Sequence, residues 1–148
     1  MTPIDPALST SRDLRGQTYL LTGATSGIGR ATALALAGRG ARLVLACRSA
    51  ERARALVEQV EAGPGPGRAV AVPLDLADLA SVRACAAEVV ARGEPVHVLV
   101  NNAGVAGVRG STAQGFELAF GVNHLGHFLL TGLLLDGLGD AAPGRVVT

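Results

Sequence analysis

The sequence predicts an α/β protein built on an open, doubly wound parallel sheet. Short apolar runs typical of strands alternate with longer alanine- and leucine-rich runs typical of helices, from residue 17 to the end of the 148-residue chain. The strand runs are almost wholly apolar, as expected where helices cover both faces of a sheet. Right-handed crossovers between consecutive strands then give the strand order 3-2-1-4-5.

We expect these elements to form one domain over residues 1–148, with a polar lead-in over 1–16. The last strand begins at Arg145 and is cut at Thr148, so we expect a sheet that is incomplete on its C-terminal side. The expected strands are 17–22, 41–47, 69–73, 96–100 and 145–148, and the expected helices are 28–38, 50–62, 79–92 and 113–135.

Local signals mark several ends of the helices. Gly38-Arg39-Gly40 ends the first helix, and Ser49 is the expected N-cap of the second. A turn is expected over 137–144, where glycines and a proline gather. Three residues near the start of the third helix are candidates to cap it: Asp75, Asp78 and Ser81.

Composition excludes several classes of protein. The net charge is +1, with 13 arginines and no lysine, which gives no basis for nucleic-acid or membrane-surface binding. We expect no membrane span, because no stretch approaches the roughly 20 apolar residues of one, and no secretory leader at the N-terminus. Cys47 and Cys85 are expected in the core rather than in a disulfide or metal site. We therefore expect a cytoplasmic protein without a metal.

A glycine-rich turn follows the first strand. The stretch from Thr22 to Gly29 reads T-G-A-T-S-G-I-G and leads directly into a helix. Such a helix N-terminus presents free N–H groups and a positive dipole end to a phosphate. Gly23 permits a tight turn, Gly27 permits close approach of a ligand, and Gly29 lets the helix lie close to the strand.

Polar residues also follow the second, third and fourth strands, at the edge where a ligand binds. Arg48 is either a solvent-exposed residue or a partner for the 2′-phosphate of NADP. We favour NADP over NAD because no acidic residue lies between the glycine turn and Glu51. Asp75 can cap a helix, bond an adenine amino group, or do both. The Asn101-Asn102 pair is either a turn or a floor under a ribose, with Gly104 permitting close approach.

An asparagine interrupts the long apolar helix. Asn123 is unfavourable in mid-helix unless its amide has a hydrogen-bonding role, and Gly126 weakens the helix further. We expect a local break that frees a backbone carbonyl for a water. His124 and His127 lack further ligands at metal-binding spacing and are expected to pack or to lie on the helix surface.

Together these motifs resemble the short-chain dehydrogenase/reductase family, in its retinol dehydrogenase and protochlorophyllide reductase-like branch. The resemblance covers Leu14 to Thr148 and implies a Rossmann-type fold with an NADP cofactor. It implies that Asn123 belongs to the catalytic set. The implied cofactor-binding residues are Gly23, Thr25, Ser26, Gly27, Ile28, Gly29, Arg48, Asp75, Leu76, Asn102, Ala103 and Gly104.

The family's chemistry is reversible hydride transfer between a nicotinamide and a small carbonyl or alcohol substrate. It uses a serine, a tyrosine, a lysine four residues later, and the backbone carbonyl of the asparagine. Of these only Asn123 is present, because the chain has no lysine and Tyr19 lies in the first strand. We therefore expect this chain alone to be an inactive cofactor-binding portion of an oxidoreductase.

Two alternatives compete with this hypothesis. In the first, the chain acts as a non-catalytic dinucleotide-sensing or protein-interaction module. The second is a nucleotide-dependent methyltransferase, and the spacing of the glycines and Asn102-Ala103-Gly104 argue against it. The 113–135 helix is a possible homo-oligomer surface, because this helix commonly lies in a dimer interface in the family.

Overall fold

Five parallel strands form one sheet in the order β3-β2-β1-β4-β5, which confirms the predicted topology. The structure is a computed structural model that describes residues 13–140 and 144–148. Central β1 pairs with β2 and β4, so its carboxyl end lies between theirs. The strands are β1 Thr18–Thr22, β2 Arg42–Cys47, β3 Arg68–Pro73, β4 Val98–Val100 and β5 Arg145–Val147.

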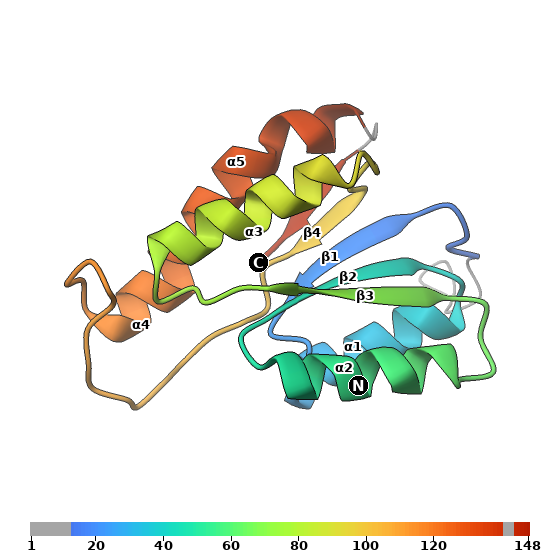
Figure 1. The fold of residues 1–148 in the computed structure, drawn as a ribbon, viewed down its shortest axis with the longest axis horizontal. Coiled ribbons are helices and arrows are strands. Elements are labelled where there is room, and N and C mark those ends of the chain that lie inside the picture. The colour runs from blue at the N-terminus through green and yellow to red at the C-terminus, as the bar shows by residue number, and fades with distance from the viewer. Residues whose placement is uncertain (1–12, 141–143) are drawn as a thin grey trace, which may run out of the picture.

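Helices cover both faces of this sheet (Figure 1). Helices α1 and α2 lie on one face, and α3 and α5 lie on the other. A short helix, a π-helical segment and α5 follow one another without a break. The bounds are α1 Gly27–Gly38, α2 Ala50–Glu61, α3 Leu79–Ala91, α4 Leu118–Phe120, η2 Gly121–Gly126 and α5 His127–Asp140.

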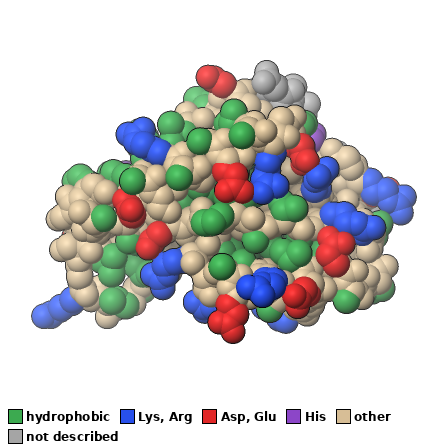
Figure 2. Space-filling model, in the orientation of Figure 1, with side chains coloured by type: hydrophobic (Ala, Val, Ile, Leu, Met, Phe, Trp, Pro, Cys, Tyr) green, Lys and Arg blue, Asp and Glu red, His purple; other side chains and the backbone are tan. Residues whose placement is uncertain are grey.

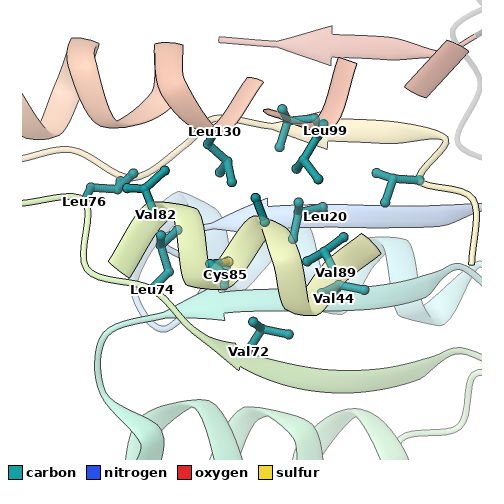
Figure 3. Close-up of a cluster of buried hydrophobic side chains, with 14 of the residues drawn as sticks. Leu20, Val44, Val72, Leu74, Leu76, Val82, Cys85, Val89, Leu99 and Leu130 are labelled. Atoms are coloured by element: carbon teal, nitrogen blue, oxygen red, sulfur yellow. The ribbon is translucent and has the colours of Figure 1, made fainter. Parts of the chain in front are cut away.

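Alternation along the strands builds two cores. In β1, Leu20 points into the core beneath α3 and α5, whereas its neighbour Leu21 points into the core beneath α1 and α2. Val44 and Leu45 of β2 divide in the same way. Figure 3 shows the first core, in which Cys85 of α3 lies among strand side chains. The apolar strands of the sequence are therefore explained by burial on both faces.

Side-chain caps fix the starts of two helices. Ser49 Oγ accepts the N–H of Arg52 at 3.3 Å, which confirms it as the cap of α2. Of the three candidates for α3, Asp78 is the cap, because its carboxylate accepts the N–H of Ala80 at 2.9 Å. The ends of α1 and α2 lie within a residue of their predicted positions.

The long helix was predicted wrongly at both ends. It starts at Leu118 rather than 113, because the backbone of Thr112 pairs with Phe116 in a turn and the carboxylate of Glu117 caps the next N–H groups. It ends at Asp140 rather than 135, so part of the expected 137–144 turn is helical. Residues 141–143 of that turn lie outside the described residues.

The combined helix also corrects the expectation about membrane spans. Residues Leu118–Leu138 are long and apolar enough to cross a membrane by length and composition. In the structure this helix packs on the sheet, and Leu130, Leu134 and Leu138 are buried in the core with α3. Buried core helices pass the same test of composition, so the finding is weak support for a span.

Part of the polar lead-in packs against the domain. Leu14 is buried in the core beneath α1 and α2, and its N–H bonds the carbonyl of Arg39 at 2.9 Å. Residues 1–12 lie outside the described residues.

Charges of both signs intersperse on the face that Figure 2 shows, and several form surface pairs such as Arg42 with Glu94 at 2.6 Å.

Candidate functional site

The carboxyl ends of β1, β2, β3 and β4 border one cavity of about 410 Å³, a size typical of small-molecule sites. All the residues that the sequence assigned to the cofactor line it: Gly23, Thr25, Ser26, Gly27, Ile28, Gly29, Arg48, Asp75, Leu76, Asn102, Ala103 and Gly104. Four separate loops therefore meet as the parallel topology requires.

The glycine turn has the geometry that its spacing predicts. Gly23 has a φ of +67°, and a Cβ there would lie 2.7 Å from the Cα of Ala103. A Cβ on Gly29 would overlap the carbonyl oxygen of Gly23 and the side-chain amide of Asn102. Gly27, with a φ of +49°, has no atom within 4 Å of its missing Cβ. The turn therefore packs tightly against Ala103 and Asn102, and it is open toward the cavity at Gly27.

Helix α1 starts at this turn without a side-chain cap. Ser26 occupies the N-cap position but forms no capping bond, in contrast to Ser49 and Asp78 at the starts of α2 and α3. The first N–H groups of an α-helix have no partners within the helix. At α1 no side-chain cap satisfies these groups, so they can donate to a ligand, and the helix dipole favours an anion there. A dinucleotide phosphate fits this position.

At the end of β2, Arg48 and Arg52 line the cavity together with Ser49. The Arg48 side chain is exposed and forms no hydrogen bond or ion pair within the described part of the chain. The preceding residue, Cys47, is buried, and burial raises the pKa of its thiol. The polar chemistry at this end of the cavity is therefore cationic.

At the end of β3, Asp75 organises its own turn. Its Oδ1 accepts the N–H of Ala77 at 2.9 Å, and its own N–H bonds Ser81 Oγ at 2.9 Å. Asp75 therefore does not cap α3, yet it lines the cavity. Leu76 is buried beside it, and a Cβ on Gly126 would lie 2.8 Å from the Leu76 carbonyl oxygen. Gly126 thus lets the π-helical segment pack closely against this loop.

At the end of β4, Asn102 holds the glycine turn in place. Its side-chain amide donates to the carbonyl oxygens of Thr22 at 3.0 Å and Gly23 at 3.3 Å. The asparagine is thus both a turn residue and part of the cavity wall. The neighbouring Asn101 donates to Thr131 Oγ1 at 3.0 Å, while its buried Oδ1 has no partner within the described residues.

Asn123 lies beside the cavity rather than in its lining. Its Oδ1 accepts the N–H of Val105 at 2.8 Å, and its Nδ2 donates to the Val105 carbonyl at 2.9 Å. The expected irregularity of the helix is present as the π-helical segment Gly121–Gly126. The amide therefore has the role that a mid-helix asparagine needs, which is to fasten the loop after β4.

The sequence did not identify the contact between His127 and Thr22, neither of which lines the cavity. Both are buried, and His127 Nε2 lies 2.9 Å from Thr22 Oγ1. Their signal in the sequence was slight: a histidine four residues after Asn123 in an apolar helix. His124, in contrast, is exposed and stacks between Phe120 and Phe128.

Other candidate groups lie elsewhere. The hydroxyl of Tyr19 bonds Gln17 at 3.1 Å and does not line the cavity. Both cysteines are free and buried, as predicted, and burial raises the pKa of Cys85 to about 11. The described residues contain no group of three or more His, Cys, Asp or Glu side chains that could hold a metal ion.

Comparison with known proteins agrees with this geometry. A sequence model of the short chain dehydrogenase family matches residues 17–148. Retinol dehydrogenase 11 of Mus musculus is 47% identical over 135 residues, which are 90% of this chain and 43% of that protein. Dehydrogenase/reductase SDR family member 13 of Bos taurus is 49% identical over 134 residues, which are 90% of this chain and 35% of that protein.

The fold has close counterparts among solved structures. The crystal structure of a metagenomic short-chain oxidoreductase in complex with NADP matches with a TM-score of 0.78 at 32% identity. The match covers 91% of this chain and 62% of that one. The chain spans less than half the length of the two curated relatives above. On its sequence, its strand order and its glycine turn, the chain belongs to the short-chain dehydrogenase family, in the retinol dehydrogenase-like branch.

Proposed function

We propose that this chain is the cofactor-binding portion of an NADP(H)-dependent oxidoreductase. The enzyme would transfer a hydride between the nicotinamide and a small carbonyl or alcohol substrate. The uncapped start of α1 and the open side of Gly27 supply a place for the pyrophosphate. The loops after β3 and β4 would hold the adenine and the ribose through Asp75 and Asn102.

The preference for NADP rests on Arg48. It is a cavity-lining guanidinium without an ion-pair partner in the described residues, at the strand end where dinucleotide folds distinguish the two cofactors. Asp75, at the end of β3, is the acidic residue in the lining. A guanidinium binds a phosphate through two parallel hydrogen bonds, whereas it gains little from a ribose hydroxyl.

Fluorescence titration of the 148-residue chain with NADPH and NADH tests this preference. Replacing Arg48 by Ala should weaken NADPH binding by about 10- to 100-fold, the value of one or more charge-assisted hydrogen bonds, and leave NADH binding nearly unchanged. Arg54→Ala is the matched control, because Arg54 is an exposed arginine of α2 outside the cavity lining. Equal affinity for the two cofactors, unaffected by R48A, would refute the NADP assignment.

Catalysis by this chain alone is not expected. Asn123 is the member of the family's catalytic set that the sequence contains, and the chain has no lysine. General acid–base catalysis contributes about 10²- to 10⁴-fold to such reactions. We therefore propose that the chain binds NADPH without consuming it in the presence of an aldehyde. Steady oxidation of NADPH by the purified chain would contradict this.

A second candidate is a non-catalytic dinucleotide-sensing or protein-interaction module. The observation that favours it is the exposed apolar side of the long helix, where Phe120 is 50% and Phe128 is 72% exposed. The same surface would serve a homo-oligomer of the enzyme. Reading the coding sequence downstream of Thr148 for a serine and a Tyr-x-x-x-Lys motif separates the enzyme from the module. For the enzyme and for the module alike, we propose a cytoplasmic location, since both cysteines are free, as is usual in a reducing compartment.

A further inference from the structure

Three segments of the chain meet at one buried hydroxyl. Thr22, at the end of β1, is fully buried, and its Oγ1 accepts the N–H groups of Asn102 and Ala103, each at 3.0 Å. A hydroxyl has two acceptor lone pairs and one proton, so these two bonds use its acceptor capacity. The proton can go to His127 Nε2 at 2.9 Å or to the Val100 carbonyl at 3.4 Å. The shorter contact makes the imidazole its partner.

The direction of that bond fixes the state of the ring. Since His127 Nε2 accepts a hydrogen bond from the Thr22 hydroxyl, the ring is neutral and carries its hydrogen on Nδ1. Nδ1 then donates to the backbone carbonyl of Asn123, which lies 3.2 Å away. Each polar atom in this path has a partner of the right kind.

The helix is arranged so that this bond can form. In a regular α-helix the N–H of residue 127 would bond the carbonyl of residue 123. Here the N–H of His127 bonds the carbonyl of His124 instead, at the end of the π-helical segment. The ring of His127 bonds the Asn123 carbonyl, so a side chain occupies the place of the regular helical donor.

These contacts join two parts of the proposed site. Asn102 and Ala103 form the cavity wall after β4, and the strand order β2-β1-β4 puts this wall across β1 from Arg48. A cofactor whose 2′-phosphate lies at Arg48 therefore places its nicotinamide half on the β4 side. Asn123 borders that half through Val105.

We propose that His127 is a positioning residue that ties the Asn123 carbonyl to the wall formed by Asn102 and Ala103, through Thr22. The inference rests on the proposed function, because it assumes a nicotinamide dinucleotide in the cavity. It assigns one hydrogen-bond path a role in the geometry of the nicotinamide half. The path runs from the N–H groups of Asn102 and Ala103 through the Thr22 hydroxyl and the His127 ring to the Asn123 carbonyl. His127 itself does not line the cavity.

Two ligands separate positioning from general damage. NADPH extends along the whole cavity, whereas adenosine 2′,5′-bisphosphate carries the adenine and 2′-phosphate but lacks the nicotinamide half. His127→Phe and Thr22→Val in the 148-residue chain should each raise the Kd of NADPH about five- to tenfold, the value of one lost hydrogen bond. The Kd of the bisphosphate should change less than about twofold, within the few-tenths kcal/mol of a remote substitution.

Conservative variants give the second readout. Thr22→Ser keeps the hydroxyl and should bind NADPH as the unchanged chain does. His127→Gln can still accept from Thr22, and His127→Asn can still donate near Nδ1, so each should recover part of the affinity lost in H127F. His124→Gln is the matched control: the same residue type, three positions earlier, with an exposed side chain outside the path. It should leave both Kd values unchanged.

A measurement without ligand tests the hydrogen-bond path directly. Nitrogen-15 NMR of the histidine rings should show His127 protonated on Nδ1 at neutral pH, and T22V should shift its Nε2 resonance. A ring protonated on Nε2, or equal losses of NADPH and bisphosphate binding in H127F, would overturn the inference. If the unchanged chain binds neither ligand, the proposed function fails and the inference fails with it. If both bind and H127F alters neither, the inference alone fails.

Discussion

The side chain of Asn123 bonds both backbone polar groups of Val105, accepting its N–H at 2.8 Å and donating to its carbonyl at 2.9 Å. The pairing imitates one rung of a sheet ladder, with a side-chain amide in place of a second backbone. It fastens the loop after β4 to the π-helical segment. A residue that the family resemblance marks as catalytic therefore also has a structural role in this chain.

Removing this amide should loosen the loop. Asn123→Ala is expected to lower the free energy of unfolding by about 1–2 kcal/mol, since two hydrogen bonds are lost at a partly solvated site. Amide hydrogen exchange at Val105 should become faster in N123A. Asn123→Asp keeps the acceptor for the Val105 N–H, so protection of that amide should persist. Unchanged exchange in N123A would show that other contacts hold the loop.

Much of this arrangement can be predicted from the sequence, because it follows from local residue patterns or from the order of the strands. Consecutive parallel strands bring all their carboxyl ends to one edge, so residues that follow the strands, such as Arg48 and Asn102, had to meet. The glycine turn was equally predictable, because Gly23 and Gly27 adopt positive φ values and Gly29 packs against the carbonyl of Gly23. Strand order required only the right-handed crossover rule.

What was missed depends on distance or on competition between similar residues. Thr22 and His127 are 105 residues apart, and their contact depends on how the π-helical segment rotates the ring. Asp75 and Asp78 are both suitable caps, and only the path of the loop decides for Asp78. The start of the long helix at Leu118 depends on the carboxylate of Glu117, which a search for apolar periodicity overlooks.

Gly29 is expected to tolerate no side chain. In Gly29→Ala the new methyl would overlap the Gly23 carbonyl and the Asn102 amide, so the glycine turn must shift. Such overpacking costs about 1–3 kcal/mol, and NADPH binding should fall at least about tenfold. Gly38→Ala in the same helix is the control, because a methyl there meets no atom within 4 Å. Equal NADPH affinity in G29A and G38A would show that the close contact is unimportant.

Acid should destabilise the chain through His127. Burial lowers the pKa of His127 below its ordinary value of 6.5, and its bond to Asn123 only partly opposes this. Because the unfolded chain binds the proton more readily, the stability that the neutral ring contributes is present above pH 6.5. It is lost as the pH falls through the lower pKa of the folded state. Chemical denaturation between pH 7.5 and 5 should show a steeper loss of stability than in H127Q. Parallel curves for the two proteins would rule out this contribution, and H124Q should follow the unchanged chain.

The long helix presents a stacked aromatic stripe to solvent. Phe120 and His124 have ring centroids 5.3 Å apart, and His124 and Phe128 6.2 Å apart. If this stripe is a surface between copies of the chain, Phe128→Glu should dissociate the assembly, because the carboxylate would have to be desolvated in an apolar interface. Val108→Glu is the control: Val108 is also exposed, in the loop after β4. Sedimentation velocity should show F128E as a monomer while V108E and the unchanged chain remain associated. At a chain concentration of about 100 µM, sedimentation detects association stronger than roughly 5 kcal/mol. An unchanged chain that is monomeric at this concentration would contradict the assignment of this surface.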